Sequence, residues 1–148
     1  MSSTSTTPSH HTAVQTLYTA QTRTTGGRDG RGQSGDGQLD VQLSPPGSSR
    51  PGTNPEQLFA VGWSACFMGA MGLAGQALGM KLPADTHVDA EVSLRRSEAD
   101  GYFLAATLKV ALPGLPRDTG HALIQRAHET CPYSKMTRGN IDVTLELV

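Results

Sequence analysis

The second half of the chain alternates apolar and polar residues in the manner of half-buried β-strands. From residue 86, one strand has its apolar face at Val88, Ala90, Val92 and Leu94. The turn signal Asp100-Gly101 follows, and the returning strand has apolar positions at Leu104, Ala106, Leu108, Val110 and Leu112. Together these stretches predict a β-hairpin. A last strand is expected at the C-terminus from the same alternation at Ile141, Val143, Leu145 and Leu147.

A long helix is predicted to begin at Pro55. Asn54 can cap the free backbone amides, Pro55 suits the first helical position, and Glu56 brings negative charge to the first turn. Residues 58–80 contain no charged side chain, and their length would span a bilayer. They also contain five glycines, a glutamine and no flanking basic cluster. We therefore interpret this segment as a buried central helix of a protein outside the membrane.

The remaining elements complete the predicted order β-β-α-β-β-α-β. Residues 14–25 and 38–44 resemble strands, and the glycine-rich residues 26–37 between them resemble a flexible loop. A second loop is expected over residues 45–52. A shorter helix is expected over residues 117–131, where Leu123, Ala127 and Cys131 fall four apart and Pro132 ends the run. Hairpins predominate over βαβ crossovers, so the pattern predicts an α+β fold with antiparallel sheet.

Length and charge narrow the function classes. The chain has 148 residues, which predicts one domain, placed at residues 13–148 after a disordered Ser/Thr-rich tail at residues 1–12. A net charge of -1 without a long basic run gives no footprint for nucleic acid or an anionic membrane. Small neutral or apolar partners fit better. The first dozen residues lack the features of a secretory signal or transit peptide, so we expect a cytoplasmic protein.

The chain has two cysteines, Cys66 and Cys131. Unpaired cysteines are commonly small buried hydrophobes, and for an arbitrary pair that is the favoured interpretation. In a reducing compartment, a disulfide between them would be transient and chemical rather than structural. Neither cysteine belongs to a motif of metal-ligand spacing. His128 lies three residues before Cys131, but no second Cys/His pair accompanies them, and His128 fits an ordinary helix residue.

Cys66 lies about three turns into the predicted long helix, beyond the reach of the positive charge at the helix start. Its helical neighbours are apolar and would raise the pKa of its thiol: Gly62, Trp63, Ala70 and Leu73. A reactive Cys66 therefore needs a cation from elsewhere in the fold. Arg28 is the candidate, because its flanking glycines let the backbone fold closely around a site, and Glu56 could hold its guanidinium. Taken alone, Arg28 fits a solvated loop residue better than a site residue.

The glycine-rich loop itself allows two other interpretations, and both are weak. A phosphate cradle would need a Gly-Lys-Ser/Thr ending, which is missing. An RGG-like nucleic-acid segment built on Arg23, Arg28 and Arg31 would need repeated RGG units and aromatic residues for stacking bases.

Four ordered blocks of the sequence resemble the organic hydroperoxide resistance proteins, a branch of the OsmC/Ohr family. They are Tyr18-Thr19-Ala20, TGGRDG at residues 25–30, GTNPEQLFAVGWSACF at residues 52–67 and CPYSKMTRGNIDV at residues 131–143. The resemblance covers essentially everything after the tail. The OsmC branch usually has a histidine-containing approach to the helix cysteine where this chain has Gly62-Trp63-Ser64, so the organic hydroperoxide branch is preferred.

The resemblance implies a thiol-dependent peroxidase for organic hydroperoxides. The family's attacking cysteine falls on Cys66, its resolving cysteine on Cys131, its catalytic arginine on Arg28 and the partner of that arginine on Glu56. It also implies antiparallel sheets packed around two long central helices in an intertwined homodimer. No metal, haem or other bound cofactor is implied, and the electrons come from dihydrolipoyl groups on a lipoylated protein.

The apolar setting of Cys66 suggests how an organic tail could be bound. Trp63 and Phe67 are the candidate substrate-binding residues, although core packing is the better expectation for Phe67 because adjacent helical residues point about 100° apart. Three alternatives stay open at this stage: an OsmC-type peroxidase with a different substrate range, a non-catalytic thiol redox sensor, and a structural protein with two inert cysteines.

Overall fold

A computed structural model describes residues 13–148, so the tail predicted at residues 1–12 lies outside the described part of the chain. The predicted hairpin is confirmed. Strand β4 (His87–Ser97) pairs antiparallel with β5 (Gly101–Ala111), in continuous register from His87 opposite Ala111 to Ser97 opposite Gly101. Gly101 has a φ of 69°, a left-handed conformation that glycine adopts freely, which is why the Asp-Gly signal located this turn.

The C-terminal strand corrects one prediction. Strand β6 (Asp142–Leu147) joins the same sheet beside β5, but it runs parallel to β5, with Ala105 opposite Asp142. The sheet β4-β5-β6 is therefore mixed, and the expectation of purely antiparallel sheet is wrong at this edge. The physical reason is the connection between β5 and β6, which contains two helices and returns the chain to the end at which β5 began.

A second, antiparallel sheet is formed by β1 (Thr22–Thr25), β2 (Arg31–Ser34) and β3 (Asp40–Gln42). Two predictions are corrected here. Of residues 14–25, only the last four pair as a strand, and β2 lies inside the segment expected to be a flexible loop. The sequence around β2 is glycine-rich and polar, so it has no apolar alternation to mark a strand. Its pairing follows from the turn before it, where Gly26 has a φ of 74°.

The long helix α1 (Pro55–Ala77) begins where the sequence predicted. Asn54 caps it by accepting a hydrogen bond from the Gln57 amide at 2.9 Å. Helix α2 (Arg117–Thr130) also begins as predicted. A short helix α3 (Pro132–Thr137) follows it and was not predicted. Pro132 both ends α2 and starts α3, because proline disrupts a helix interior but suits the first helical position.

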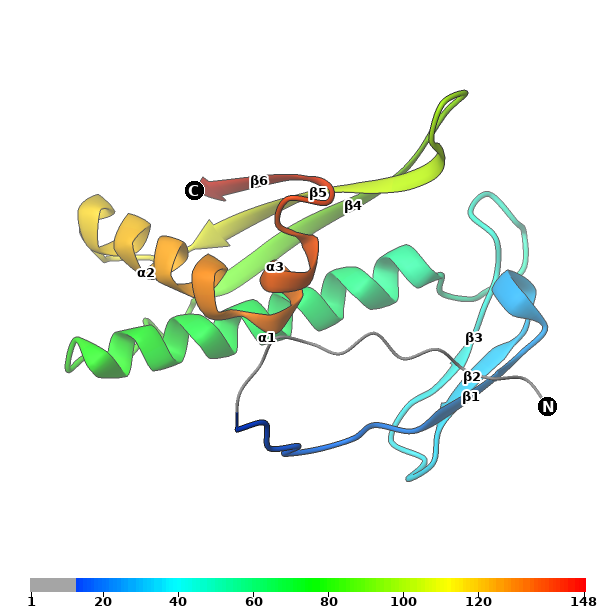
Figure 1. Cartoon of the computed structure of the whole chain (residues 1–148), viewed down its shortest axis with the longest axis horizontal. Helices are drawn as coiled ribbons and strands as arrows, with labels where there is room; N and C mark the ends of the chain where they lie inside the picture. Colours follow the sequence, from blue (N-terminus) through cyan, green and yellow to red (C-terminus); the bar gives the residue numbers. More distant parts are fainter. Residues whose placement is uncertain (1–12) are drawn as a thin grey trace.

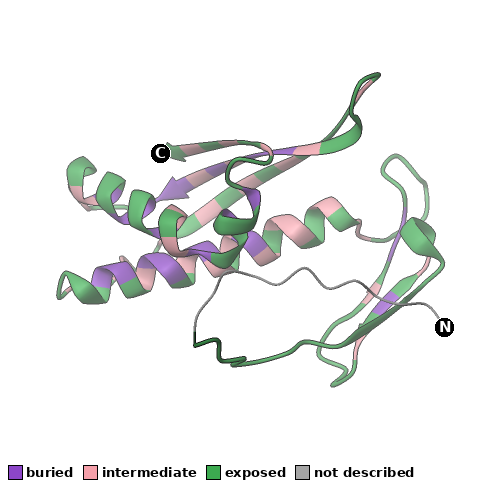
Figure 2. Cartoon of the chain, in the orientation of Figure 1, coloured by how far each residue is buried: buried purple, intermediate pink, exposed green. Residues whose placement is uncertain are grey.

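Helices α1 and α2 pack against each other and against the mixed sheet, α1 beside β4 and α2 beside β6 (Figure 1). Its inner face joins β5 and α2 in a core whose largest fully buried side chains are Trp63, Phe67, Met71, Leu108, Leu123 and Val110. Figure 2 shows this buried band in purple along α1, while the sheet β1-β2-β3, at the far end of α1, is mostly exposed. The part of the chain that packs best is thus the half that contains both cysteines.

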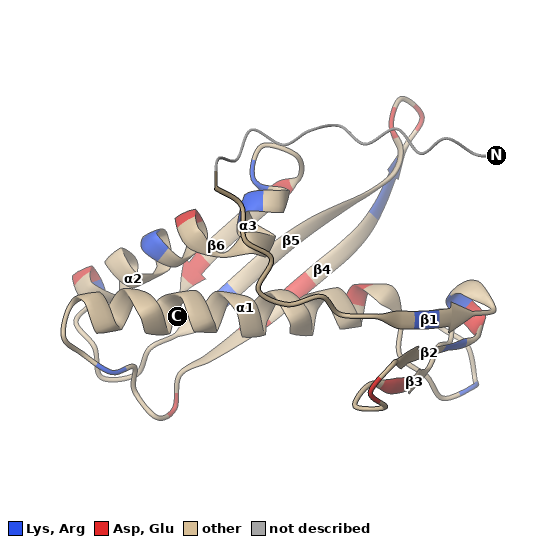
Figure 3. Ribbon diagram, turned by 60° about the horizontal axis from the view of Figure 1, so that its bottom comes forward, with Lys and Arg blue, Asp and Glu red and all other residues tan. Residues whose placement is uncertain are grey.

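The outer face of α1 has no partner among residues 13–148. It carries exposed apolar side chains, including Val61 at 71% and Leu73 at 68% exposure. Beyond Glu56 the helix has no charged residue, and Figure 3 shows it tan along that length. By length and composition α1 could cross a membrane, but the core helices of other proteins also meet these two criteria. Of its most apolar 18 residues, 33% are buried. The buried inner face agrees with the interpretation of α1 as a central helix. The outer face leaves apolar side chains exposed to solvent.

Candidate active site

The structure brings the two cysteines together. Cys66 lies near the middle of α1, and Cys131 is the single residue between α2 and α3. The thiol of Cys131 donates a hydrogen bond to the sulfur of Cys66, with 3.1 Å between the two Sγ atoms. Both are free thiols; Cys131 is fully buried and Cys66 half-buried. Residues 65 positions apart in sequence therefore face each other at a distance from which a disulfide can close with small side-chain movements.

The surroundings of Cys66 within one chain keep its thiol protonated. Burial raises the pKa of Cys66, and hydrogen bonding of its protonated thiol with the Cys131 sulfur raises it further. A hydrogen bond from the backbone of Tyr133 lowers it, but the net direction is upward. No cation contributes to this balance. Within the described part of one chain, the cation that the sequence required beside Cys66 is thus not supplied.

Trp63 and Phe67 lie in the core around this pair. Both side chains are fully buried, and the indole N–H of Trp63 donates to the hydroxyl of Ser134 at 3.1 Å. Phe67 is therefore a core-packing residue in the structure. Neither ring presents a surface to a substrate in the described chain, so a substrate-binding role for Trp63 and Phe67 stays a prediction without structural support.

Arg28 and Glu56 form a second pair. The two guanidinium Nη atoms of Arg28 donate to the two carboxylate oxygens of Glu56, at 3.1 and 2.8 Å. Bidentate geometry of this kind fixes the orientation of both groups. The hydrogen bond from Arg28 lowers the pKa of Glu56, and the same contact raises the pKa of Arg28, so both stay charged at neutral pH. Arg28 is 48% exposed and Glu56 is 13% exposed.

Two local devices position Arg28. It lies in a 3-10 helix, Gly27–Asp29, that links β1 to β2, and Gly30 closes this turn so tightly that a Cβ atom there would overlap the Thr25 carbonyl. The neighbouring Asp29 forms an ion pair with Arg50 in the loop before α1. The turn that carries Arg28 is thus attached both to the start of α1 and to the preceding loop.

The two pairs do not meet within one chain. Glu56 and Cys66 are ten residues apart on the same helix, which separates their Cα atoms by about 15 Å along the axis and places them on different faces. A groove of about 500 Å³ adjoins Arg28 and Glu56, and its other walls include Ala60 from α1 and Ala90, Val92 and Leu94 from β4. This groove is largely apolar and contains neither cysteine.

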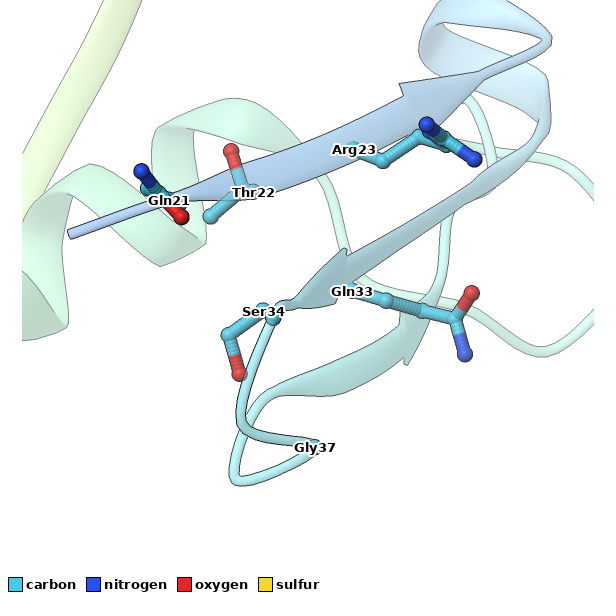
Figure 4. Close-up of a pocket in the computed structure, with 7 residues that line it drawn as sticks. Gln21, Thr22, Arg23, Gln33, Ser34 and Gly37 are labelled. Carbon is cyan, nitrogen blue, oxygen red and sulfur yellow. The ribbon is translucent and has the colours of Figure 1, made fainter.

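A separate hollow of about 570 Å³ is lined by residues of β1 and β2 and of the turn after β2 (Figure 4). Its walls are Gln21, Thr22, Arg23, Gln33 and Ser34, with two glycines. It contains no cysteine and none of the four predicted catalytic residues. Among residues 13–148, no group of three or more His, Cys, Asp or Glu side chains could hold a metal ion.

Sequence reasoning missed four residues that shape these pairs: Tyr133, Ser134, Asp29 and Arg50. Tyr133 and Ser134 lie on the short helix that was not predicted, and no periodic signal marks six residues. Asp29 and Arg50 carry opposite charges on two neighbouring loops, but polar loop residues of this kind pair in many ways, and only the folded backbone selects one. His128 lies on α2 as expected, with its Nδ1 atom buried and unpartnered.

A long apolar helix packed on a mixed sheet, with two thiols in contact at its middle, defines an α+β protein with a candidate two-cysteine site. Residues 45–146 match the family model of OsmC-like proteins. The organic hydroperoxide resistance protein of Xanthomonas axonopodis pv. citri is 45% identical over 135 residues, covering 88% of this chain and 94% of that protein. Organic hydroperoxide resistance protein OhrA of Bacillus subtilis is 45% identical over 139 residues, covering 90% and 97%.

The structural comparison agrees with the sequence comparison. The crystal structure of OhrB of Bacillus subtilis superposes with a TM-score of 0.84 at 42% identity, covering 90% of this chain and all of that chain (100%). The chain therefore belongs to the OsmC/Ohr family, on the branch of the organic hydroperoxide resistance proteins. The family resemblance and the α+β OsmC/Ohr-like fold class expected from the sequence are confirmed.

Proposed function

We propose that this protein is a thiol peroxidase that reduces organic hydroperoxides to alcohols. The observation that carries the proposal is the contact between Cys66 and Cys131, 3.1 Å apart at the centre of the buried region. Relatives named for organic hydroperoxide resistance, at 45% identity over most of both chains, support a role in detoxifying such compounds. Two adjacent thiols supply the electrons, so the reaction needs no bound cofactor.

The reaction proceeds in two steps on the protein. The thiolate of Cys66 attacks the distal oxygen of ROOH, the O–O bond breaks, and the alkoxide takes a proton to leave as ROH, which makes Cys66 a sulfenic acid. The Cys131 sulfur then attacks the sulfenic sulfur, the S–O bond breaks, and water leaves as the disulfide forms. Closure of the disulfide protects Cys66 from irreversible oxidation.

Arg28 and Glu56 have distinct roles in the first step. Arg28 stabilises the Cys66 thiolate and donates a hydrogen bond to the departing oxygen as charge builds on it. Glu56 holds the guanidinium in a bidentate contact, so that its orientation is set before the peroxide arrives. The groove beside this pair, with Ala90, Val92 and Leu94 on its wall, takes the organic part of the substrate. Binding of an apolar tail favours alkyl and lipid hydroperoxides over hydrogen peroxide.

The active unit is a homodimer, because one chain does not complete the site. Glu56, which binds Arg28, lies about 15 Å along α1 from Cys66 of the same chain, so the arginine that activates this cysteine comes from a second copy. The outer face of α1 is apolar and uncovered, and the exposed β1-β2-β3 sheet has too little buried surface to be stable alone. Intertwining two copies covers both surfaces and brings the two halves of each site together.

The disulfide is reopened by a partner that carries dihydrolipoyl groups. Such a group has two thiols, which reduce the Cys66-Cys131 disulfide by two successive exchanges and become a cyclic disulfide themselves. This proposal rests on the family resemblance. We expect the protein to act in the cytoplasm, where reduced thiols persist.

Peroxide turnover by the wild type, Cys66→Ser and Cys131→Ser tests the central proposal. With cumene hydroperoxide and dihydrolipoamide, the wild type turns over repeatedly, Cys66→Ser is inactive, and Cys131→Ser consumes one equivalent without forming the internal disulfide. Full activity in Cys66→Ser would overturn the assignment. A single stoichiometric oxidation of the wild type, with no recycling, would identify a redox sensor instead.

Mixed dimers test whether the site is shared between two copies. Cys66→Ser and Arg28→Ala are each inactive or slow alone. After subunit exchange, half of the dimers contain one copy of each, and each such dimer has one complete site out of two, so roughly a quarter of the wild-type activity returns. An arginine that served its own chain would give no recovery above the two parents.

A further inference from the structure

Helix α3 is held in place by hydrogen bonds to both neighbouring helices. From α1, the indole N–H of Trp63 donates to the hydroxyl of Ser134 at 3.1 Å, and both side chains are fully buried. From the other side, Arg138 at the end of α3 donates to the backbone carbonyl of His128 in the last turn of α2, at 2.7 Å. A helix of six residues has little stability of its own, so these contacts decide where it lies.

The Trp63–Ser134 bond joins the same two parts of the chain as the sulfur pair. Trp63 precedes Cys66 by three residues on α1, and Ser134 follows Cys131 by three residues, so each lies about one helical turn from its cysteine. A buried indole N–H is costly to leave unpaired, and Ser134 is its partner. The bond therefore fixes the height and rotation of α3 relative to α1.

We propose that Trp63 and Ser134 are positioning residues of the thiol site, whose buried hydrogen bond locks α3 against α1 and holds Cys131 at reacting distance from Cys66. This inference rests on the proposed peroxidase function and adds two residues that act through the cysteines. It also gives Trp63 a role other than the substrate contact expected from the sequence.

Disulfide closure requires a precise sulfur–sulfur distance, which is why the position of α3 matters. A disulfide has a sulfur–sulfur distance of about 2.05 Å, so closure asks the pair to approach by about 1 Å from its resting contact. A misplacement of that size at a reacting centre can slow a reaction a hundredfold. Cys131 is the hinge residue between two helices, and without the lock α3 could shift it by such an amount.

Two further contacts place α3 close against the Cys66 face of α1. The backbone of Tyr133 lies near enough to Cys66 to lower the pKa of its thiol, and the rings of Phe59 and Tyr133 meet edge to face with centroids 5.8 Å apart. Gly62, one turn before Cys66, leaves room for this approach, because a Cβ atom there would lie 3.3 Å from the Tyr133 hydroxyl oxygen. Movement of α3 would therefore alter the Cys66 thiol as well as the position of Cys131.

Ser134→Ala tests the lock, with Thr137→Val as its matched control. Thr137 is also a buried residue of α3, but its hydroxyl bonds to the Ser134 carbonyl within α3 and not to α1. Both variants lose one buried hydroxyl, and only Ser134→Ala loses the connection between helices. The rate of Cys66-Cys131 closure is measured after oxidation with cumene hydroperoxide and, separately, with diamide, which oxidises the thiol pair without peroxide chemistry.

In Ser134→Ala, closure slows by about tenfold or more with both oxidants, as expected for misplacement at a reacting centre. The pH profile of Cys66 alkylation also shifts upward, because the Tyr133 contact is weakened. Thr137→Val stays within twofold of the wild type in both measurements. If Ser134→Ala closes at the wild-type rate, or Thr137→Val slows equally, the lock is contradicted. A wild type that closes with diamide but ignores peroxide would refute the proposed function and leave the lock intact.

The double variant Trp63→Phe with Ser134→Ala guards against simple misfolding. It removes both polar groups together, so no buried donor is left unpaired and the packing is largely kept. This variant folds and still closes slowly, because the connection is missing. Recovery of the wild-type rate in the double variant would show that the unpaired indole, and not the lost lock, had caused the defect.

Discussion

The two pairs at the candidate site are built in opposite ways. Cys66 and Cys131 are held by the packed core of α1, α2, α3 and the mixed sheet, where most of the large buried side chains lie. Arg28 and Glu56 are held by hydrogen bonds and charge at the open end of α1, beside a sheet that is mostly exposed. The first pair is complete within one chain, whereas the second has no thiol within its reach.

This difference separates two requirements of the same reaction. Bringing two sulfurs into contact needs precise and permanent placement, which dense packing provides. Activating a thiol needs a charge that meets solvent-borne substrate, which favours an exposed group. Packing resists salt and mild acid, while a surface ion pair is weakened by both. We therefore expect changes in the core to alter stability and disulfide closure, and changes near Arg28 to alter peroxide attack alone.

The largest effect is expected from Trp63→Ala, which opens a cavity in the cysteine region. Loss of a fully buried Trp side chain lowers the free energy of unfolding by about 3–5 kcal/mol, and the Ser134 hydroxyl also loses its partner. Urea denaturation measures the change. The control is Tyr102→Ala, an aromatic residue 70% exposed on β5, which should lose less than about 1 kcal/mol. Equal losses in the two variants would contradict the assignment of the core.

Gly30→Ala should damage the arginine region and spare the cysteines. A Cβ atom at residue 30 would overlap the Thr25 carbonyl, so the turn that carries Arg28 must move. The rate constant for peroxide attack should fall by about tenfold or more, while closure of the Cys66-Cys131 disulfide by diamide is unchanged. Stopped-flow measurements of both reactions test this separation.

Gly35→Ala is the matched control, in the turn that follows β2. The nearest atom to its added Cβ would be the Gln21 carbonyl oxygen at 3.8 Å, an ordinary contact. Its peroxide rate should equal that of the wild type. A similar loss in both glycine variants would mean that the sheet tolerates no substitution and that Arg28 is not the cause.

Asn54→Ala should produce a smaller effect, confined to the start of α1. Asn54 accepts the Gln57 amide hydrogen bond, and loss of such a cap costs about 1 kcal/mol. Amide exchange should increase in the first turn, which carries Glu56, and stay unchanged around Cys66 three turns further on. Asn54→Asp keeps an acceptor and should retain the wild-type stability. Increased exchange along the whole helix would show that the two regions are not independent.

The smallest effect is expected for the Arg28–Glu56 pair itself, read as a dependence of stability on pH. The contact with Arg28 lowers the pKa of Glu56 in the folded state. Its stabilisation is therefore fully present above the ordinary glutamate pKa of about 4.3 and is lost as the pH falls through the lowered value. The difference in unfolding free energy between the wild type and Glu56→Gln should shrink over that range, and added salt should reduce it at neutral pH.

A difference that grows on acidification would contradict this direction. It would mean that Glu56 is stabilised in its protonated form, in conflict with two donated hydrogen bonds from Arg28. The comparison at high salt then distinguishes an exposed ion pair, whose contribution disappears, from a buried one, whose contribution persists.

The sequence by itself determined the parts of this protein that depend on local patterns. Alternation with a period of two located the β4-β5 hairpin, and Asn54-Pro55-Glu56 located the start of α1. It also supplied Cys66, Cys131, Arg28 and Glu56 as candidates, through motifs that resemble one family. These signals are local because each depends on residues a few positions apart, and the backbone responds to them in the same way in any fold.

Only the tertiary structure decided how those residues meet. Strand β2 has no apolar alternation, so its pairing depends on the turn at Gly26 and on its neighbours β1 and β3. The parallel direction of β6 depends on the two helices before it, and α3 depends on the buried Trp63–Ser134 bond. The contact of Cys66 with Cys131, and the separation of Arg28 from both, arise from packing between distant segments. No local pattern encodes such distances, because they are set by the whole core at once.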